Sequence, residues 1–158
     1  MMDNKKKKGR YERVYNQLTE LLNPHSNEIA SMATIVAVLH HKFDYFFWTG
    51  FYLLTDGDLI VGPYQGSVAC IKLTKGTGVC WAGVNRKETV IVPDVHKFPG
   101  HIACDDRSNS EIVIPVYGKN GKVAAVLDVD SKELNSFDEE DAKGLERIVD
   151  LIYRKVIK

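Results

Sequence analysis

Cys104 lies in an unusual setting for a structural cysteine, within the segment 101–115, HIACDDRSNSEIVIP. Acids and small hydroxylated residues surround it, whereas a buried structural cysteine usually lies in an apolar run. Two further cysteines, Cys70 and Cys80, lie upstream at the edges of strand or turn patterns, and Glu111 opens the strand-like run that follows. A thiol with thiol partners and a nearby acid has the groups that redox chemistry at sulfur requires.

The neighbours of Cys104 restrict the electrophile that it can attack. Asp105 and Asp106 disfavour a thiolate, and Arg107 offsets their charge only in part. This setting favours an electrophile that is itself activated by protonation, such as a sulfoxide held against a carboxylic acid.

Two other uses of the cysteines fit the spacing less well. Cys70, Cys80, Cys104 and His101 offer four zinc ligands, but their spacing matches no paired C-x-x-C knuckle. Cys104 can also be read as an acyl-transfer nucleophile with His96 or His101 as its base, but no oxyanion-hole signature accompanies them.

Three acids form the second candidate cluster. Asp128 and Asp130 are two residues apart on a predicted strand, so they share one face of it. Glu111 lies near them if the mixed face of its own strand is the same face. Close acids repel, so at least one pKa rises unless a cation is present, and either a metal ion or a ligand ammonium is a natural partner. The alternative is a solvent-exposed strand end whose acids are separated by water.

Two aromatic residues and a glycine-rich turn are further candidates for ligand binding. Trp48 and Tyr52 are four apart on a strand-like run and point to the same face, either as the wall of a pocket beside the acids or as ordinary core. The turn 76–78 precedes a predicted helix, so its backbone N–H groups can meet an anion such as a ligand carboxylate.

Helices at both ends of the chain and strands between them must position these residues. Apolar residues at three- and four-residue spacing predict helices over 11–22, 29–39 and 145–156, and a short helix over 79–86. We expect strands over 46–54, 59–64, 70–73, 90–92, 111–117 and 123–130. The segment 93–108 is polar and is predicted to be a long functional loop. This order indicates an α+β fold with a largely antiparallel sheet.

Local signals mark where these elements begin and turn. The Ser-Asn pair at 26–27 can cap the second helix, and the Asp-Gly pair at 56–57 predicts a hairpin. Ser136 and Glu139 have the S-x-x-E spacing of a capping box before the last helix.

Composition indicates a single soluble globular domain. The chain has 158 residues, a formal net charge of +0 and three cysteines. This charge gives no global case for nucleic acid or an anionic membrane, and the odd cysteine count argues against a secreted disulfide framework. No signal peptide pattern is visible, so we expect a cytoplasmic protein. The lysine run 5–8 predicts a flexible basic tail over residues 1–9, followed by one domain over 10–158.

Several longer runs resemble one known family. They are WTGFYLL (48–54), GPYQGSVACIKL (62–73), GTGVC (76–80), VPDVHKFPGHIACDDRSNSEIVIP (92–115) and VLDVDS (126–131). These runs are similar to those of free methionine-(R)-sulfoxide reductases, which are single-domain enzymes with the GAF fold. The resemblance includes all three cysteines, a set that generic GAF sensors do not carry together with the SEIV and LDVDS runs.

The resemblance implies roles for individual residues. Cys104 corresponds to the catalytic cysteine, Cys70 to the principal resolving cysteine and Cys80 to an auxiliary one. Trp81 follows Cys80 where the family usually has glycine, which bears on the mobility of that turn. The implied substrate-binding or acid-catalytic residues are Trp48, Glu111, Asp128 and Asp130, and the shared strand face adds Tyr52 as a substrate-binding candidate.

The implied reaction is the reduction of free methionine-(R)-sulfoxide through a sulfenic acid on Cys104 and a disulfide with Cys70, which a thioredoxin-type dithiol reopens. We expect no metal ion or cofactor, and a homodimer through the terminal helices is an option. Two hypotheses from other classes are a noncatalytic GAF sensor of ligand or redox state and a stand-alone metal-binding protein. Methionine formation from methionine sulfoxide and dithiothreitol separates the enzyme from both.

Overall fold

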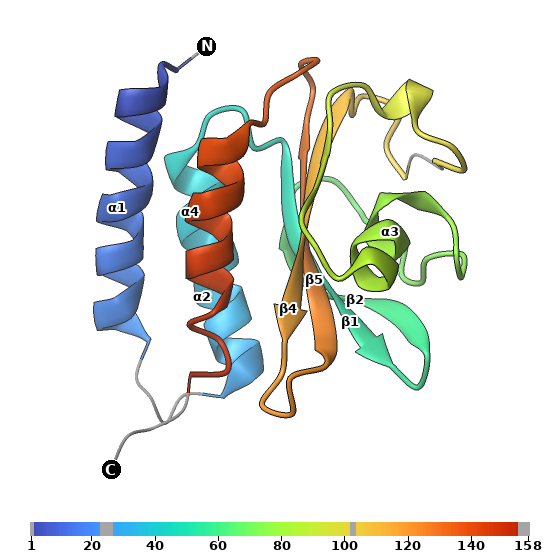
Figure 1. Ribbon diagram of the computed structural model, residues 1–158, viewed down its shortest axis with the longest axis horizontal. Coiled ribbons are helices and arrows are strands. Elements are labelled where there is room, and N and C mark those ends of the chain that lie inside the picture. Colours follow the sequence, from blue (N-terminus) through green and yellow to red (C-terminus); the bar gives the residue numbers. More distant parts are fainter. Residues whose placement is uncertain (1, 23–26, 102–103, 155–158) are drawn as a thin grey trace.

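A five-stranded antiparallel sheet with the strand order β2-β1-β5-β4-β3 forms the centre of the computed structural model, which describes residues 2–22, 27–101 and 104–154. Figure 1 shows α1, α2 and α4 on one face of this sheet and α3 with the longer loops on the other. The strands are β1 (Trp48–Thr55), β2 (Asp58–Gln65), β3 (Val90–Val92), β4 (Ser110–Tyr117) and β5 (Val123–Ser131). The helices are α1 (Asn4–Leu21), α2 (Glu28–Lys42), α3 (Gly78–Arg86), the 3-10 turn η1 (Val95–Lys97) and α4 (Glu139–Val149). The predicted α+β architecture is confirmed.

The register of β4 and β5 brings the three acids onto one face of the sheet. Glu111 pairs with Asp130, and Val113 pairs with Asp128. Directly opposite residues on antiparallel strands point to the same face, so Glu111, Asp128 and Asp130 all face the α3 side. The alternate positions of both strands are apolar and pack in the core beneath the three long helices: Ile112, Ile114, Val116, Ala125, Leu127 and Val129.

Two of the three predicted start and turn signals are confirmed. Asn27 caps α2 by accepting hydrogen bonds from two backbone N–H groups, and the Asp-Gly pair at 56–57 has the positive φ angles of a tight hairpin turn. The capping box of the last helix differs from the prediction. Its N-cap is Asp138, which exchanges hydrogen bonds with Asp141, because α4 begins at Glu139, later than the S-x-x-E spacing requires.

The N-terminal residues are not the flexible tail that the lysine run predicts. Asp3 caps α1, which begins at Asn4, and Lys7 is 1% exposed. Its ammonium donates to Asp141 at 2.7 Å and to Asp138 at 3.0 Å on α4. One lysine of the run therefore anchors α1 to α4, because helix periodicity turns it inward onto two acids.

The predicted strand 70–73 is instead a loop beside β2. It makes one isolated bridge, between Lys72 and Ile60, and Ile71 is 73% exposed. Too few of its side chains pack against the sheet to extend a strand there. The proposed cap at Ser26 and the apolar position Val156 lie outside the described residues. Within residues 2–22, 27–101 and 104–154, no helix has the length and apolarity that crossing a membrane requires.

Candidate active site

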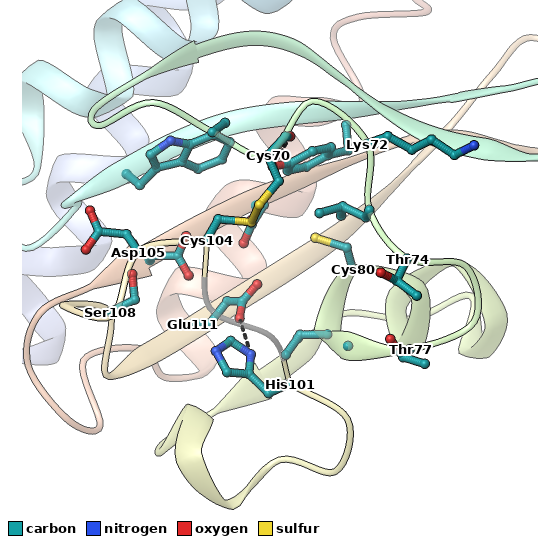
Figure 2. A pocket seen from close by; sticks show the side chains of 18 of the residues that line it. Cys70, Lys72, Thr74, Thr77, Cys80, His101, Cys104, Asp105, Ser108 and Glu111 are labelled. Carbon is teal, nitrogen blue, oxygen red and sulfur yellow. Dashed lines mark hydrogen bonds and ion pairs between the residues drawn. A yellow bond between two sulfur atoms is a disulfide. The ribbon is translucent and has the colours of Figure 1, made fainter.

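A cavity of about 120 Å³ opens on the α3 face of the sheet. Strands β1, β4 and β5 form its floor, and α3 with the turn before it forms one wall. The loop 66–74 and residues 100–101 and 104–108 form its mouth. Figure 2 shows the cysteines, Glu111 and His101 around this space. The cavity is lined by eight residues that the sequence singles out for chemistry: Trp48, Tyr52, Cys70, Cys80, Cys104, Glu111, Asp128 and Asp130.

The three carboxylates lie at the bottom of the cavity, and no lysine or arginine of the described residues forms an ion pair with them. Glu111 and Asp128 are 4% and 6% exposed, respectively. Burial, then the charges of the neighbouring acids, raises the pKa of Glu111 well above its usual range, and burial does the same for Asp130. The pKa of Asp128 rises to about 6 through burial, opposed by hydrogen bonds from Glu111 and Cys80. Asp128 is thus the ionised member of the cluster, and Glu111 holds a proton.

The Cys80 thiol faces this cluster from the first turns of α3. It is buried, and burial followed by the charge of Asp128 raises its pKa well above the usual range. A thiol that hydrogen-bonds a carboxylate stays protonated at neutral pH and is a poor nucleophile. Trp81, which follows it, is 5% exposed and packed in the same core.

A disulfide joins the other two cysteines at the mouth of the cavity. Cys70 and Cys104 are 34 residues apart in sequence, and their Cα atoms are 5.7 Å apart. Figure 2 shows the bond between the two loops. Cys104 is exposed and Cys70 is half-buried. With two of its four thiol and imidazole ligands in a covalent bond, the zinc site of Cys70, Cys80, Cys104 and His101 does not form in this state.

Asp105 ties the two cysteine loops together. Its carboxylate accepts a hydrogen bond from Ser67 Oγ at 2.7 Å, and Arg107 donates to it through Nε at 2.9 Å and Nη2 at 2.6 Å. These hydrogen bonds hold the pKa of Asp105 well below its usual range, and the bonds from Arg107 contribute most. The sequence predicts that the negative charge of Asp105 disfavours a thiolate at Cys104. In the structure, Arg107 compensates this charge.

Trp48 and Tyr52 are both cavity wall and support for the Cys70 loop. Their rings stack at 5.9 Å between centroids, and Tyr64 stacks on Trp48 at 5.3 Å. Trp48 Nε1 donates to the carbonyl of Ser67 at 3.0 Å, and the Tyr52 hydroxyl donates to the carbonyl of Cys70 at 3.1 Å. Both interpretations of this pair are correct, because the two side chains line the cavity and are also buried.

The histidines take different places. His101 lines the cavity with Nδ1 3.9 Å from Glu111 Oε2, and burial lowers its pKa, so the ring is neutral at pH 7. His96 instead pairs with Asp94 at 3.1 Å and is not among the residues that line the cavity, which removes it as a base for Cys104. Sequence reasoning missed Ser67 and Ser108, which have no signal beyond their place near the cysteines.

Comparisons with known proteins agree with this geometry. Residues 32–153 match the family described as GAF domain. GAF domain-containing protein A of Dictyostelium discoideum is 49% identical over 147 residues, 92% of each chain. Free methionine-R-sulfoxide reductase of Escherichia coli (strain K12) is 40% identical over 139 residues, 88% of this chain and 84% of its own. The X-ray structure of free methionine-R-sulfoxide reductase from Neisseria meningitidis in complex with its substrate superposes with a TM-score of 0.88 at 36% identity, covering 97% of this chain and 90% of that one.

Proposed function

The chain belongs to the GAF-domain family of free methionine-R-sulfoxide reductases, and we propose that it reduces the R epimer of free methionine sulfoxide to methionine. The observation that carries this proposal is the arrangement of the cavity. Three carboxylates, of which Glu111 and Asp128 are buried and Asp130 is half-buried, lie beneath the disulfide within one small aromatic-walled space. Such a space fits a zwitterion with a free ammonium and an apolar end.

Binding uses the charges of the substrate. The ammonium lies against Asp128 and Asp130, which share one strand face and lack an ion-pair partner among the described residues. The substrate carboxylate meets the backbone N–H groups at the start of α3, where Thr77 and Gly78 line the cavity. The methyl group packs against Trp48. A peptide-bound sulfoxide lacks the ammonium and leaves the buried acids unpaired.

The chemical step is an attack of Cys104 sulfur on the sulfoxide sulfur. Glu111, or Asp130 beside it, protonates the departing oxygen, since the environments of both favour the protonated acid. The S–O bond breaks and the protonated oxygen leaves as water, so Cys104 is joined to the substrate sulfur. Water then attacks Cys104 sulfur and breaks this S–S bond: the bonding electrons go to the substrate sulfur, which leaves as methionine, a proton returns to the acid, and Cys104 becomes a sulfenic acid. Cys70 then condenses with the sulfenic acid, which forms the disulfide and releases water. The Cys70–Cys104 bond of the structure supports this order.

The position of Cys80 supports an auxiliary role for it. Its thiol is committed to Asp128, within α3 rather than on a loop. Cys70 lies on a loop that already reaches Cys104. We therefore assign the principal resolving step to Cys70.

Recycling requires an external dithiol, for which a cytoplasmic thioredoxin-type protein is the proposed source. Cys104 is exposed, and the apolar side chains that flank Cys70 are exposed as well, Val68 by 85% and Ile71 by 73%. A thiolate of the reductant attacks the disulfide, forms a mixed disulfide and is released by its own second thiol.

The test compares four substrates with the reduced protein and excess dithiothreitol. Free methionine-(R)-sulfoxide should yield methionine, whereas the S epimer, N-acetyl-methionine-(R)-sulfoxide and a peptide containing the sulfoxide should be reduced at least about 100-fold more slowly. Turnover of the N-acetyl compound at a rate comparable with the free R epimer would contradict the role of the carboxylates.

A further inference from the structure

Cys80, Glu111 and Asp128 offer three buried donor groups of a kind that binds metal ions. We propose that they form a site for Zn²⁺, which occupies the place of the substrate ammonium and so inhibits the enzyme competitively. The competition rests on the proposed function, whereas the metal site does not.

The geometry is close to that of a zinc centre. Cys80 Sγ and one carboxylate oxygen each from Glu111 and Asp128 all lie within 4.8 Å of one another. Tetrahedral zinc, with bonds of about 2.3 Å to sulfur and 2.0–2.2 Å to oxygen, needs donors about 3.5 Å apart. Side-chain movements of about 1 Å therefore suffice to close the donor set.

A second observation points to a missing ligand at the same place. Asp128 is 6% exposed and lines the cavity, yet its Oδ1 has no hydrogen-bond partner among the described residues. A buried carboxylate oxygen of this kind normally has a partner, so an ammonium or a metal ion is expected against it.

The donor types select the metal. A thiol with two carboxylates suits zinc, whereas Mg²⁺ and Ca²⁺ prefer oxygen ligands alone. Three protein ligands leave a fourth position open to water, as in reactive zinc sites. On coordination the Cys80 thiol gives its proton to the solvent.

The redox state of the other cysteines does not block this site and provides a clean probe of it. The chain has three cysteines, and the disulfide uses Cys70 and Cys104. Cys80 is then the single thiol of the oxidised protein. A thiolate-to-metal charge-transfer band in that form reports coordination by Cys80 and by no other residue, and the oxidised protein cannot turn over.

The experiment titrates the oxidised full-length protein with Co²⁺, a spectroscopic substitute for Zn²⁺, and records the near-ultraviolet charge-transfer band. The wild type should develop the band at one equivalent, and Zn²⁺ should abolish it. Cys80→Ser should give no band, and Asp128→Asn should weaken Co²⁺ affinity at least about ten-fold. Saturating free methionine-(R)-sulfoxide should displace the metal, and Zn²⁺ should raise the apparent KM of the reduced enzyme without changing kcat.

The outcomes separate the metal site from the proposed function. The band in wild type and its loss in Cys80→Ser support the site even if no reductase activity is found. A folded wild type without the band, or an equal band in Cys80→Ser, overturns the site even if the enzyme is active. If Cys80→Ser does not fold, unchanged Co²⁺ affinity in Asp128→Asn overturns it. A band that survives saturating sulfoxide overturns the competition.

Discussion

Glu111 and Asp128 lie in one cluster, but their surroundings favour different roles in the proposed reaction. Asp128 accepts hydrogen bonds from Glu111 and Cys80 and has a pKa of about 6, which makes it the anion of the cluster. Glu111 lies on the neighbouring strand with a pKa raised well above its usual range. An anion suits the substrate ammonium, and a protonated acid suits the departing oxygen.

Substituting each acid by its amide separates these tasks. Asp128→Asn should raise KM through the loss of a charge-assisted hydrogen bond, about 1.5–3 kcal/mol in kcat/KM, with kcat less affected. Glu111→Gln should slow the chemical step by about 10²–10⁴-fold. Rapid-quench measurement of methionine formation at saturating substrate distinguishes them. A wild-type single-turnover rate in Glu111→Gln would assign the proton to Asp130 or to water.

At this scale the sequence predicts which acids converge but not which cysteines bond. Strand alternation places Asp128 and Asp130 on one face, because the period of two is independent of tertiary structure. Glu111 joins them only if the mixed face of its own strand is the same face, and the register of β4 and β5 shows that it is. The pairing of Cys70 with Cys104 depends on two loops whose paths no local pattern encodes. Only the resemblance to a known family indicated it.

The two loops that carry Cys70 and Cys104 are held together by side chains as well as by the disulfide. Ser67 and Asp105 form a hydrogen bond between them that remains available when the cysteines are reduced. We expect this bond to keep Cys70 close to the Cys104 sulfenic acid, so that the disulfide closes quickly.

Ser67→Ala should therefore slow disulfide closure while leaving the first methionine largely unaffected. The loss of one hydrogen bond to a charged group predicts a decrease of about ten-fold. Thr89→Ala is the matched control, because it removes a hydroxyl–carboxylate bond of the same 2.7 Å length to Glu146, on an exposed surface. Stopped-flow tryptophan fluorescence and quenched alkylation follow closure. Equal closure rates in the two variants would remove Ser67 from this role.

The burial of Lys7 could not be predicted from the sequence. A lysine run at a terminus usually indicates a solvated tail, and only the packing of α1 against α4 distinguishes Lys7 from its neighbours. Its 1% exposure and two acidic partners identify a buried ion pair. In contrast, α2, α3 and all five strands lie within about three residues of their predicted ranges, whereas α1 begins seven residues earlier than predicted and α4 begins and ends earlier than the range 145–156.

Lys7→Ala should lower the free energy of unfolding by about 3–5 kcal/mol, because it leaves Asp141 buried without its cation. Lys6→Ala is the control, since the Lys6 side chain is 79% exposed and 4.0 Å from Asp3; its change should stay within about 0.5 kcal/mol. Urea denaturation measures both. Similar stabilities would show that α1 is held by apolar packing alone.

In the proposed recycling step, the disulfide and its exposed apolar neighbours form the surface that an external reductant reaches. Ile71 follows Cys70 and is 73% exposed without lining the cavity. A protein reductant buries such a side chain on docking, whereas dithiothreitol does not.

Ile71→Ser should therefore raise the KM for thioredoxin by about five-fold, the equivalent of about 1 kcal/mol, with dithiothreitol-supported activity unchanged. Leu134→Ser, at a position 57% exposed outside the residues that line the cavity, should change neither. An unaltered KM for thioredoxin in Ile71→Ser would place the docking surface elsewhere.

In the proposed reaction, one cavity removes the sulfoxide oxygen through Cys104 and Cys70. The most direct measurement mixes fully reduced protein with one equivalent of free methionine-(R)-sulfoxide, without external reductant, and maps the products by mass spectrometry. We predict one methionine per protein, a Cys70–Cys104 disulfide and a free Cys80 thiol. Cys70→Ser should still give one methionine, and Cys104→Ser none. Methionine formation by Cys104→Ser would exclude Cys104 as the attacking residue, and a wild-type disulfide that includes Cys80 would exclude Cys70 as the principal resolving residue.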